Sequence, residues 1–221
     1  MQFTPIDMKT WPRVQQFHYF ASMAPTGYSI TVRVDVTELR LALKAAGLKF
    51  FPAYLWLATG CLNRQQEFKI AERDGVVGFY DTLTPLYPVL HEDDHTVSMT
   101  WTAWQDSFDA FYRDYEENRL RFGDTHGFLS QPQTPPPPNA YTISCIPWLS
   151  FEHFAVHSYG LGAYYFPSLE AGRFVEEDGR ILMPLSLTCH HAATDGWHIT
   201  RFLEDFREEG DEAGPTARIN A

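Results

Sequence analysis

A strand, a sharp turn and a helix follow one another near the C-terminal end of the chain, and this pattern constrains the fold most. The apolar run Ile181–Leu187 predicts a buried strand, and the segment from Trp197 to about Arg207 has a helical pattern. Between them lies His190-His191-Ala192-Ala193-Thr194-Asp195-Gly196, in which the glycine provides backbone freedom for a tight turn. Two histidines therefore stand where a rigid strand ends, a common position for catalytic side chains.

His191 is the candidate general base, because a histidine with a usual pKa of about 6.5 is available as a neutral proton acceptor near neutral pH. His190 precedes it on the strand, so its side chain is expected to point to the opposite face and to have a structural role. Asp195 follows four residues after His191 and has two interpretations from spacing. It orients His191 in a catalytic triad, or it caps the final helix.

The composition narrows the class of protein. A chain of 221 residues with 44% hydrophobic residues predicts a globular domain with a substantial core. A net charge of −11 argues against binding to nucleic acid. No apolar segment approaches the length needed to span a membrane, and no signal peptide is expected. Cys61, Cys145 and Cys189 suggest neither a disulfide framework nor a zinc knuckle, so we expect a cytoplasmic protein.

Period-two alternation predicts a strand at Tyr28–Asp35. The capping-box pattern from Asp35 to Glu38 predicts the start of a helix that Gly47 ends. A second helix is predicted from Phe51 to Arg64, and a third from Ser107 to Arg121 with Asp106 as its cap. Further strands are predicted at residues 76–80, 96–102, 141–146, 151–157, 161–165, 173–175 and 181–189.

Three segments of the chain resemble the type A chloramphenicol acetyltransferases. Leu182–His198 resembles the family's active-site segment, with Pro-Leu-Ser followed by two histidines, three residues, Asp-Gly, an aromatic residue and His. Trp11-Pro12-Arg13 with Phe17 resembles the N-terminal Trp-x-Arg…Phe, and Ile143–Trp148 resembles Ile-Ser-x-x-Pro-Trp. The resemblance implies an α/β fold of the CoA-dependent acyltransferase type, a two-layer sandwich in which helices cover a mixed β-sheet. We expect one acyltransferase domain over residues 1–207 and a flexible tail over 208–221.

The resemblance also implies the reaction. Acetyl-CoA would donate its acetyl group directly to a hydroxyl group of a small acceptor, without a metal or a covalent intermediate. His191 would remove the hydroxyl proton, Ser144 would stabilise the oxyanion, and Arg13 would pair with Asp195 to brace the site. The family assembles as a trimer with the acceptor pocket between subunits, so His191 would serve a pocket built largely by a neighbouring chain.

Two sets of binding residues follow from the same resemblance. The residues expected to contact coenzyme A are Lys49, Trp148, Arg173 and Phe174. The residues expected to line the acceptor pocket are Phe20, Ala24, Thr26, Val97, Phe128, Val156, Ser158 and Glu170. Val97 stands where the family usually has phenylalanine, and Glu170 where it has threonine, so the pocket is wider and more acidic than is usual. The implied acceptor is chloramphenicol or a related small molecule, with antibiotic resistance as the implied role.

The segment His91-Glu92-Asp93-Asp94-His95 suggests an alternative, since His-Glu-x-x-His binds zinc in hydrolases when it lies on a helix. Pro88 precedes this segment and strand-like residues follow it, so a hairpin turn is favoured over a helix.

Two further alternatives concern the same scaffold. Cys145 and Cys189 are conceivable acyl carriers, but cysteine in an apolar strand is usually an unreactive core residue. A non-catalytic binding protein is the third alternative, and the presence of His191 and Ser144 together argues against it.

Overall fold

A mixed β-sheet forms one layer of the molecule. The computed structural model describes residues 1–131, 134–157 and 164–211, and the sheet has seven strands within these ranges. Its order is β2 (Gly27–Asp35), β10 (Arg180–His190), β8 (Ser168–Gly172), β7 (Ala140–Ile146), β5 (Thr84–Leu90) and β6 (Val97–Trp101), with β9 (Val175–Glu177) beside β10. Strands β5, β7 and β8 are parallel and the other pairs antiparallel, so the expected mixed sheet is confirmed.

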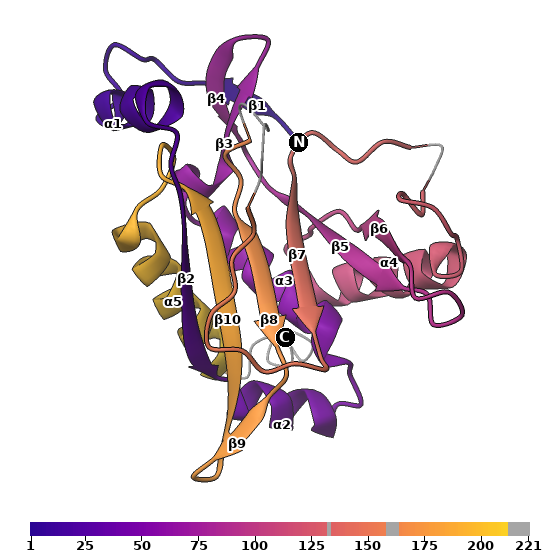
Figure 1. Cartoon of the computed structure of the whole chain (residues 1–221). Helices are drawn as coiled ribbons and strands as arrows, with labels where there is room; N and C mark the ends of the chain where they lie inside the picture. The colour runs from indigo at the N-terminus through magenta and orange to yellow at the C-terminus, as the bar shows by residue number, and fades with distance from the viewer. Residues whose placement is uncertain (132–133, 158–163, 212–221) are drawn as a thin grey trace.

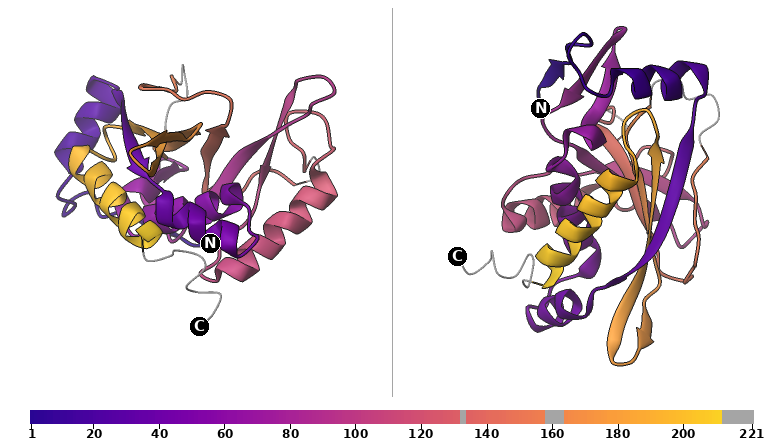
Figure 2. Two further views of the ribbon diagram at one scale, coloured as in Figure 1. Left: turned by 90° about the horizontal axis from the view of Figure 1, so that it is seen from below. Right: turned by 90° about the vertical axis from the view of Figure 1, so that its left-hand side faces the viewer.

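Four long helices cover one face of this sheet (Figures 1 and 2). They are α2 (Thr37–Ala45), α3 (Phe50–Asn63), α4 (Phe108–Phe122) and α5 (Gly196–Asp211). Helix α3 is almost wholly buried and packs against both α4 and α5. Its apolar surface meets the side of the sheet that carries Leu185, Leu187 and Ile143, which are fully buried.

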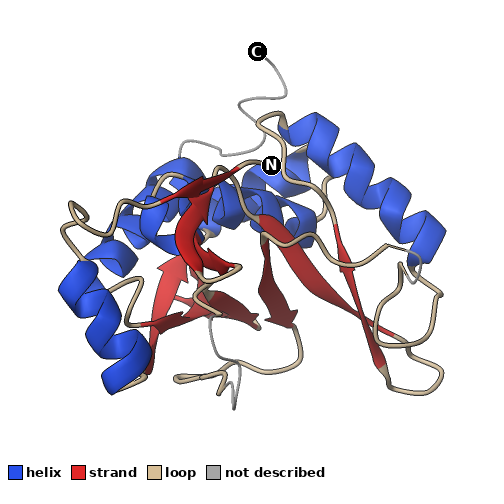
Figure 3. Cartoon of the chain, turned by 90° about the horizontal axis from the view of Figure 1, so that it is seen from above, coloured by secondary structure: helices blue, strands red, loops and turns tan. Residues whose placement is uncertain are grey.

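A smaller sheet and a short helical segment lie at the end of the molecule away from α2 (Figure 1). Strands β1 (Phe3–Pro5), β4 (Val76–Tyr80) and β3 (Ile70–Arg73) form the small sheet, and a 3-10 turn at Gln66–Lys69 precedes β3. Helix α1 (Val14–His18) and the π-helical turn Tyr19–Met23 lead into β2. Figure 3 shows the separation of the helical layer from the large sheet in a view from above.

The face of the large sheet away from the helices is polar along β2 and β10. Thr31 lies opposite Ser186, and Ser29 lies opposite Thr188. These hydroxyl groups bind the segment that follows β7: Thr31 Oγ1 accepts from the Phe154 amide at 3.2 Å, and Ser186 Oγ donates to the Phe154 carbonyl at 2.6 Å. The strand predicted at 151–157 is therefore wrong, because side-chain hydroxyls and not a neighbouring strand bind its backbone.

Other local predictions are corrected in detail. Ser107, not Asp106, caps α4, since its hydroxyl accepts from the Ala110 amide at 3.3 Å. The N-cap residue of α2 is Val36, not Asp35, and no side chain caps this helix; Asp35 instead accepts from the Thr37 amide and hydroxyl, and the expected capping box with Glu38 does not form.

Several strands of the structure differ from those that the local sequence pattern predicts. Strands β1, β3, β5 and β8 were not predicted, and the strand expected at 173–175 begins only at Val175. Of the strand expected at 161–165, residues 161–163 lie outside the described residues, and 164–165 are not in a strand.

The C-terminal helix is longer than expected. Helix α5 continues through the residues assigned to the tail as far as Asp211, and residues 212–221 lie outside the described ranges. Among the helices of the described ranges, none has the length and apolar character that a transmembrane span requires.

Candidate active site

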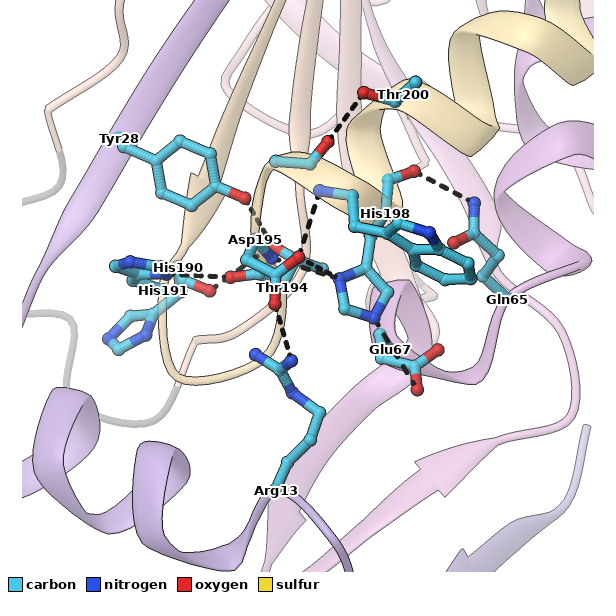
Figure 4. A network of polar contacts seen from close by, with 12 residues as sticks. Arg13, Tyr28, Gln65, Glu67, His190, His191, Thr194, Asp195, His198 and Thr200 are labelled. Atoms are coloured by element: carbon cyan, nitrogen blue, oxygen red, sulfur yellow. Dashed lines mark hydrogen bonds and ion pairs between the residues drawn. The ribbon is translucent and has the colours of Figure 1, made fainter.

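His191 lies in the turn that follows β10, where two backbone contacts orient it. Its amide donates to the Thr26 carbonyl at 2.8 Å, and its Nδ1 lies 3.0 Å from the Thr194 carbonyl oxygen (Figure 4). A carbonyl oxygen only accepts hydrogen bonds, so Nδ1 carries the proton in this contact. The neutral ring therefore has its lone pair at Nε2, the atom that a general base needs.

Two aromatic rings contact the imidazole of His191. The Phe20 ring stacks on it with centroids 4.0 Å apart, and the Tyr28 ring meets it edge-on at 5.1 Å. The Tyr28 hydroxyl donates to Thr194 Oγ1 at 3.3 Å, which links this ring to the residue that orients His191. Few rotations of the imidazole are compatible with these contacts, so its free nitrogen has a defined direction.

His190 contacts different groups from its neighbour. Its Nδ1 accepts from the Ala192 amide at 3.1 Å, and its ring meets Tyr165 edge-on at 5.0 Å. Burial, and then the nearby His191, lower the pKa of His190. A neutral His190 that accepts a backbone hydrogen bond stabilises the turn.

Asp195 pairs with the N-terminal segment. Its Oδ2 accepts from Arg13 Nη1 at 2.7 Å, while Oδ1 accepts from the Trp197 amide at 3.0 Å and lies 3.0 Å from His198 Nδ1. Burial raises the pKa of Asp195, but the Arg13 hydrogen bond and the His198 charge outweigh it, and the net shift is downward. In the triad interpretation Asp195 would accept a hydrogen bond from His191 Nδ1, but the acceptor in the structure is the Thr194 carbonyl oxygen. The Arg13 pair and the helix cap both occur.

The Arg13–Asp195 pair provides a first prediction. Arg13→Ala and Asp195→Ala should each destabilise the fold by about 1–3 kcal/mol, less than the 3–5 kcal/mol of a fully buried pair, because the Asp195 side chain is 36% exposed. The double variant should be no less stable than the worse single variant. Urea unfolding of all four proteins measures this, with Arg201→Ala as a control that removes an exposed pair with Glu204. Additive losses would show that Arg13 and Asp195 are not partners.

Ser144 lies far from His191 in the same chain. Ser144 on β7 is opposite Glu170 on β8, which is opposite Ser186 on β10, five residues before His191. Two strand spacings of about 4.8 Å and five residues at about 3.3 Å each place the two side chains roughly 19 Å apart. Ser144 and His191 of one chain therefore cannot both contact the same reacting group of a substrate.

The residues expected to line the acceptor pocket divide in the same way. Phe20, Ala24 and Thr26 lie beside His191, and Thr26 Oγ1 donates to the Ala24 carbonyl at 2.6 Å. Val97 and Phe128 lie at the opposite edge of the sheet, where the Met99 amide donates to the Phe128 carbonyl at 2.7 Å.

Of the remaining members of this set, Val156 lies on the face of the sheet away from the helices. The Val156 amide donates to Thr188 Oγ1 at 3.2 Å, which places Val156 over β10. Ser158 lies outside the described residues.

Glu170 is a buried carboxyl group between Ser144 and Ser186 on the polar face. It is only 4% exposed, Ser168 donates to its Oε1, and its Oε2 is without a hydrogen-bond partner among the described residues. Burial raises its pKa to about 7, against the lowering effect of the Ser168 hydrogen bond. The charge of this side chain therefore changes near neutral pH.

The raised pKa of Glu170 predicts a pH-dependent stability. A carboxyl whose pKa is higher in the folded state favours folding below its unfolded pKa of about 4.3 and loses that contribution as the pH rises through about 7. The melting temperature of the wild type should therefore fall between pH 5 and pH 8 relative to that of Glu170→Gln. Glu176→Gln, which changes an exposed carboxylate, is the control. An equal change of melting temperature with pH in the wild type and in Glu170→Gln would contradict the prediction.

The residues expected to contact coenzyme A lie near the ends of β7 and β8 and the start of α3. The Arg173 amide donates to the Leu149 carbonyl at 2.9 Å, next to the exposed Trp148. The Phe174 ring packs edge-on against Phe50 at 4.9 Å, and the Arg40 guanidinium lies 5.0 Å from its centroid. The sequence did not indicate Arg40, because it belongs to α2, far from Phe174 along the chain.

Lys49 has an acidic partner that the sequence did not indicate. Its Nζ lies 2.9 and 3.0 Å from the two carboxylate oxygens of Glu116 on α4. Glu116 neutralises the charge of Lys49. Because half of the Lys49 side chain is exposed, its ammonium group remains accessible to a competing anion.

Two alternatives from the sequence find no support. His91–His95 forms a turn between β5 and β6, so its histidines do not share the face of a helix as zinc hydrolases require. Burial raises the pKa of the Cys145 thiol to about 11 and that of Cys189 to about 12, so neither is a ready nucleophile.

Comparison with known proteins agrees with this geometry. The family model described as chloramphenicol acetyltransferase matches residues 1–207. A chloramphenicol acetyltransferase from Clostridium perfringens is 38% identical over 210 residues, 94% of this chain and 98% of its own length. A solved chloramphenicol acetyltransferase superposes with a TM-score of 0.78 at 25% identity, covering 94% of this chain and 99% of that one.

A more distant structure shares only the fold. A probable dihydrolipoamide acetyltransferase from Listeria monocytogenes superposes with a TM-score of 0.57 at 16% identity, covering 97% of this chain and 96% of that one. The expected α/β fold of the CoA-dependent acyltransferases is therefore confirmed. With a family model that spans nearly the whole chain and a relative of 38% identity, the protein belongs to the chloramphenicol acetyltransferase family.

Proposed function

We propose that the protein transfers the acetyl group of acetyl-CoA to a hydroxyl group of chloramphenicol or a related small acceptor. The observation that carries this proposal is the 3.0 Å contact between His191 Nδ1 and the Thr194 carbonyl oxygen, which requires a proton on Nδ1 and so leaves Nε2 as a proton acceptor. Family membership supports the same chemistry.

In the proposed reaction, His191 Nε2 removes the acceptor's hydroxyl proton while the oxygen attacks the thioester carbonyl carbon. Ser144 donates a hydrogen bond to the carbonyl oxygen as negative charge develops there. The C–S bond then breaks, the acetyl ester leaves, and the imidazolium returns its proton to the thiolate of coenzyme A. Arg13 and Asp195 hold the turn on which His191 lies.

A homotrimer with active sites between subunits is part of the proposal. Within one chain, Ser144 and His191 are roughly 19 Å apart by strand spacing and rise, so a complete site takes His191 from one subunit and Ser144 from its neighbour. Exposed apolar side chains near His191 and at the β6 edge of the sheet support such an interface. They are Tyr19, Met23, Val97, Phe128 and Trp197.

Coenzyme A would bind at the ends of β7 and β8, where Trp148 and Phe174 offer apolar surface and Lys49 and Arg173 offer positive charge. Local cations are needed there because the net charge of the chain is −11. The free thiols of Cys145 and Cys189 fit a reducing cytoplasm. No metal takes part in the proposed transfer.

The acceptor defines the test of this function. Purified protein is mixed with acetyl-CoA and either chloramphenicol or one of several small alcohols, and release of the coenzyme A thiol is followed together with the mass of the product. We expect thiol release that depends on chloramphenicol and a product heavier by one acetyl group. Release with another alcohol but not with chloramphenicol would retain the chemistry and replace the acceptor. Release with none of them would refute the proposed function.

The Lys49–Glu116 pair predicts how coenzyme binding is tuned. Glu116→Gln should lower the KM for acetyl-CoA by about twofold to fivefold, because an exposed ion pair of about 0.5–1 kcal/mol no longer competes with the phosphates for Lys49. Glu117→Gln removes the same charge from the neighbouring exposed position and should leave the KM unchanged. A higher KM in Glu116→Gln would mean that Glu116 holds Lys49 in its binding position.

A further inference from the structure

A cluster of possible metal ligands lies outside the site described above. The turn between β5 and β6 carries His91 and Asp93, and the loop after α4 carries His126. One donor atom from each of these three residues lies within 4.8 Å of the other two. His91 is buried, whereas Asp93 and His126 are exposed, so solvent has access to the cluster from one side.

Neighbouring oxygens hold both imidazoles in this cluster. His91 Nε2 lies 3.0 Å from Ser98 Oγ, and His126 Nδ1 lies 3.1 Å from an Asp94 carboxylate oxygen. Both ring nitrogens of His126 face carboxylates, since Nε2 lies 3.3 Å from an Asp93 oxygen, so zinc would replace the proton between Nε2 and Asp93 while Nδ1–H donates to Asp94. Metal-binding histidines commonly donate their other N–H to a carboxylate or another oxygen in this way, which fixes the tautomer of the ring.

The spacing is close to that of a metal site. Zinc–nitrogen distances of about 2.0–2.1 Å in a tetrahedral site place the donor atoms about 3.4 Å from one another. The distances between the donor atoms of the cluster therefore need to shorten by little more than 1 Å. The two imidazole rings are stacked at 4.1 Å between centroids, so the exposed His126 ring must also turn to aim its lone pair at the ion.

We propose that His91, Asp93 and His126 bind a zinc ion, with water in the fourth position. Two imidazoles and a carboxylate are a donor set that zinc favours, and the chain's net charge of −11 favours a cation. The ligands differ from those of the His-Glu-x-x-His interpretation, since Glu92 and His95 are not among them. The ion does not take part in acetyl transfer.

The consequence of such a site is a link between two segments of the edge of the sheet. Ser98, beside Val97, contacts His91, and Phe128 lies two residues after His126. The Phe128 carbonyl already accepts from the Met99 amide on β6. Bound zinc would hold the loop after α4 against the β5–β6 hairpin. Because zinc would bind the folded protein and not the unfolded chain, it would stabilise the folded state.

Zinc titration tests the proposal. Tag-free full-length protein is treated with EDTA, dialysed, and titrated with Zn²⁺ in a calorimeter, and cobalt is added separately to observe the visible absorption of a tetrahedral site. We expect one ion per chain, and a melting temperature that rises with zinc. His126→Ala should weaken zinc binding by more than about tenfold, and Asp94→Asn by about tenfold to a hundredfold through loss of the oriented ring.

A nearby histidine provides the matched control. His95→Ala removes an exposed imidazole from the same turn and should leave the zinc affinity and the cobalt spectrum unchanged. Asp93→Asn serves as a second ligand variant and should weaken binding as His126→Ala does. Absence of saturable binding, equal affinity in wild type and His126→Ala, or equal losses in His95→Ala and His126→Ala would each overturn the proposal.

Discussion

Replacement of His191 by alanine should lower kcat by about 10²- to 10⁴-fold, the range that a general base usually contributes. The Thr194 carbonyl, Phe20 and Tyr28 surround the imidazole, and none of these groups is a base able to replace it near neutral pH. Burial further raises the already high pKa of the Tyr28 hydroxyl, so this hydroxyl remains protonated. Steady-state acetyl transfer to the best acceptor found in the panel measures the effect.

The adjacent histidine is the control for this experiment. His190→Ala removes the acceptor for the Ala192 amide and the contact with Tyr165, so it should reduce the yield of folded protein more than the turnover of the folded fraction. Circular dichroism and gel filtration establish that each variant is folded and assembled. A folded His191→Ala protein with near-wild-type turnover would refute the role proposed for His191.

Replacement of Ser144 by alanine should lower kcat by about 10²- to 10³-fold, which corresponds to the roughly 2.7–4 kcal/mol of a lost oxyanion donor. The KM for acetyl-CoA should change little, because the hydrogen bond strengthens as charge develops in the transition state. Ser144 lies on a regular strand between β5 and β8, so the smaller side chain should be accommodated without loss of the fold. An unchanged kcat would remove Ser144 from the catalytic residues.

Mixed oligomers distinguish a site within one chain from a site between chains. Neither the His191→Ala nor the Ser144→Ala chain alone forms an intact site. In randomly mixed trimers whose sites pair His191 of one subunit with Ser144 of the next, about a quarter of the sites would contain both native residues. Co-expression of the two variants should therefore restore about a quarter of wild-type activity. Activity no higher than that of the single variants would show that each site draws both residues from one chain.

Much of the local structure follows from the sequence alone. Alternation of apolar and polar residues correctly predicts β2, the apolar run Ile181–Leu187 correctly predicts most of β10, and the turn residues after β10 place His191 at a strand end. These predictions succeed because residues close together in the chain determine them. The segment predicted as a strand at 151–157 fails for the opposite reason, since Thr31, Ser186 and Thr188, which bind its backbone, lie on β2 and β10.

The sequence by itself determined the family, the position of the candidate base and the resemblance that implied the Arg13–Asp195 pair. Only the tertiary structure decided which atom orients His191, that Glu116 neutralises Lys49, and that Ser144 lies too far away to share a site with His191 of the same chain. Arg13 and Asp195 are 182 residues apart in sequence and yet in contact, and no periodicity encodes such a distance. Side-chain identity sets what each group can do chemically, whereas strand order and register set which groups meet.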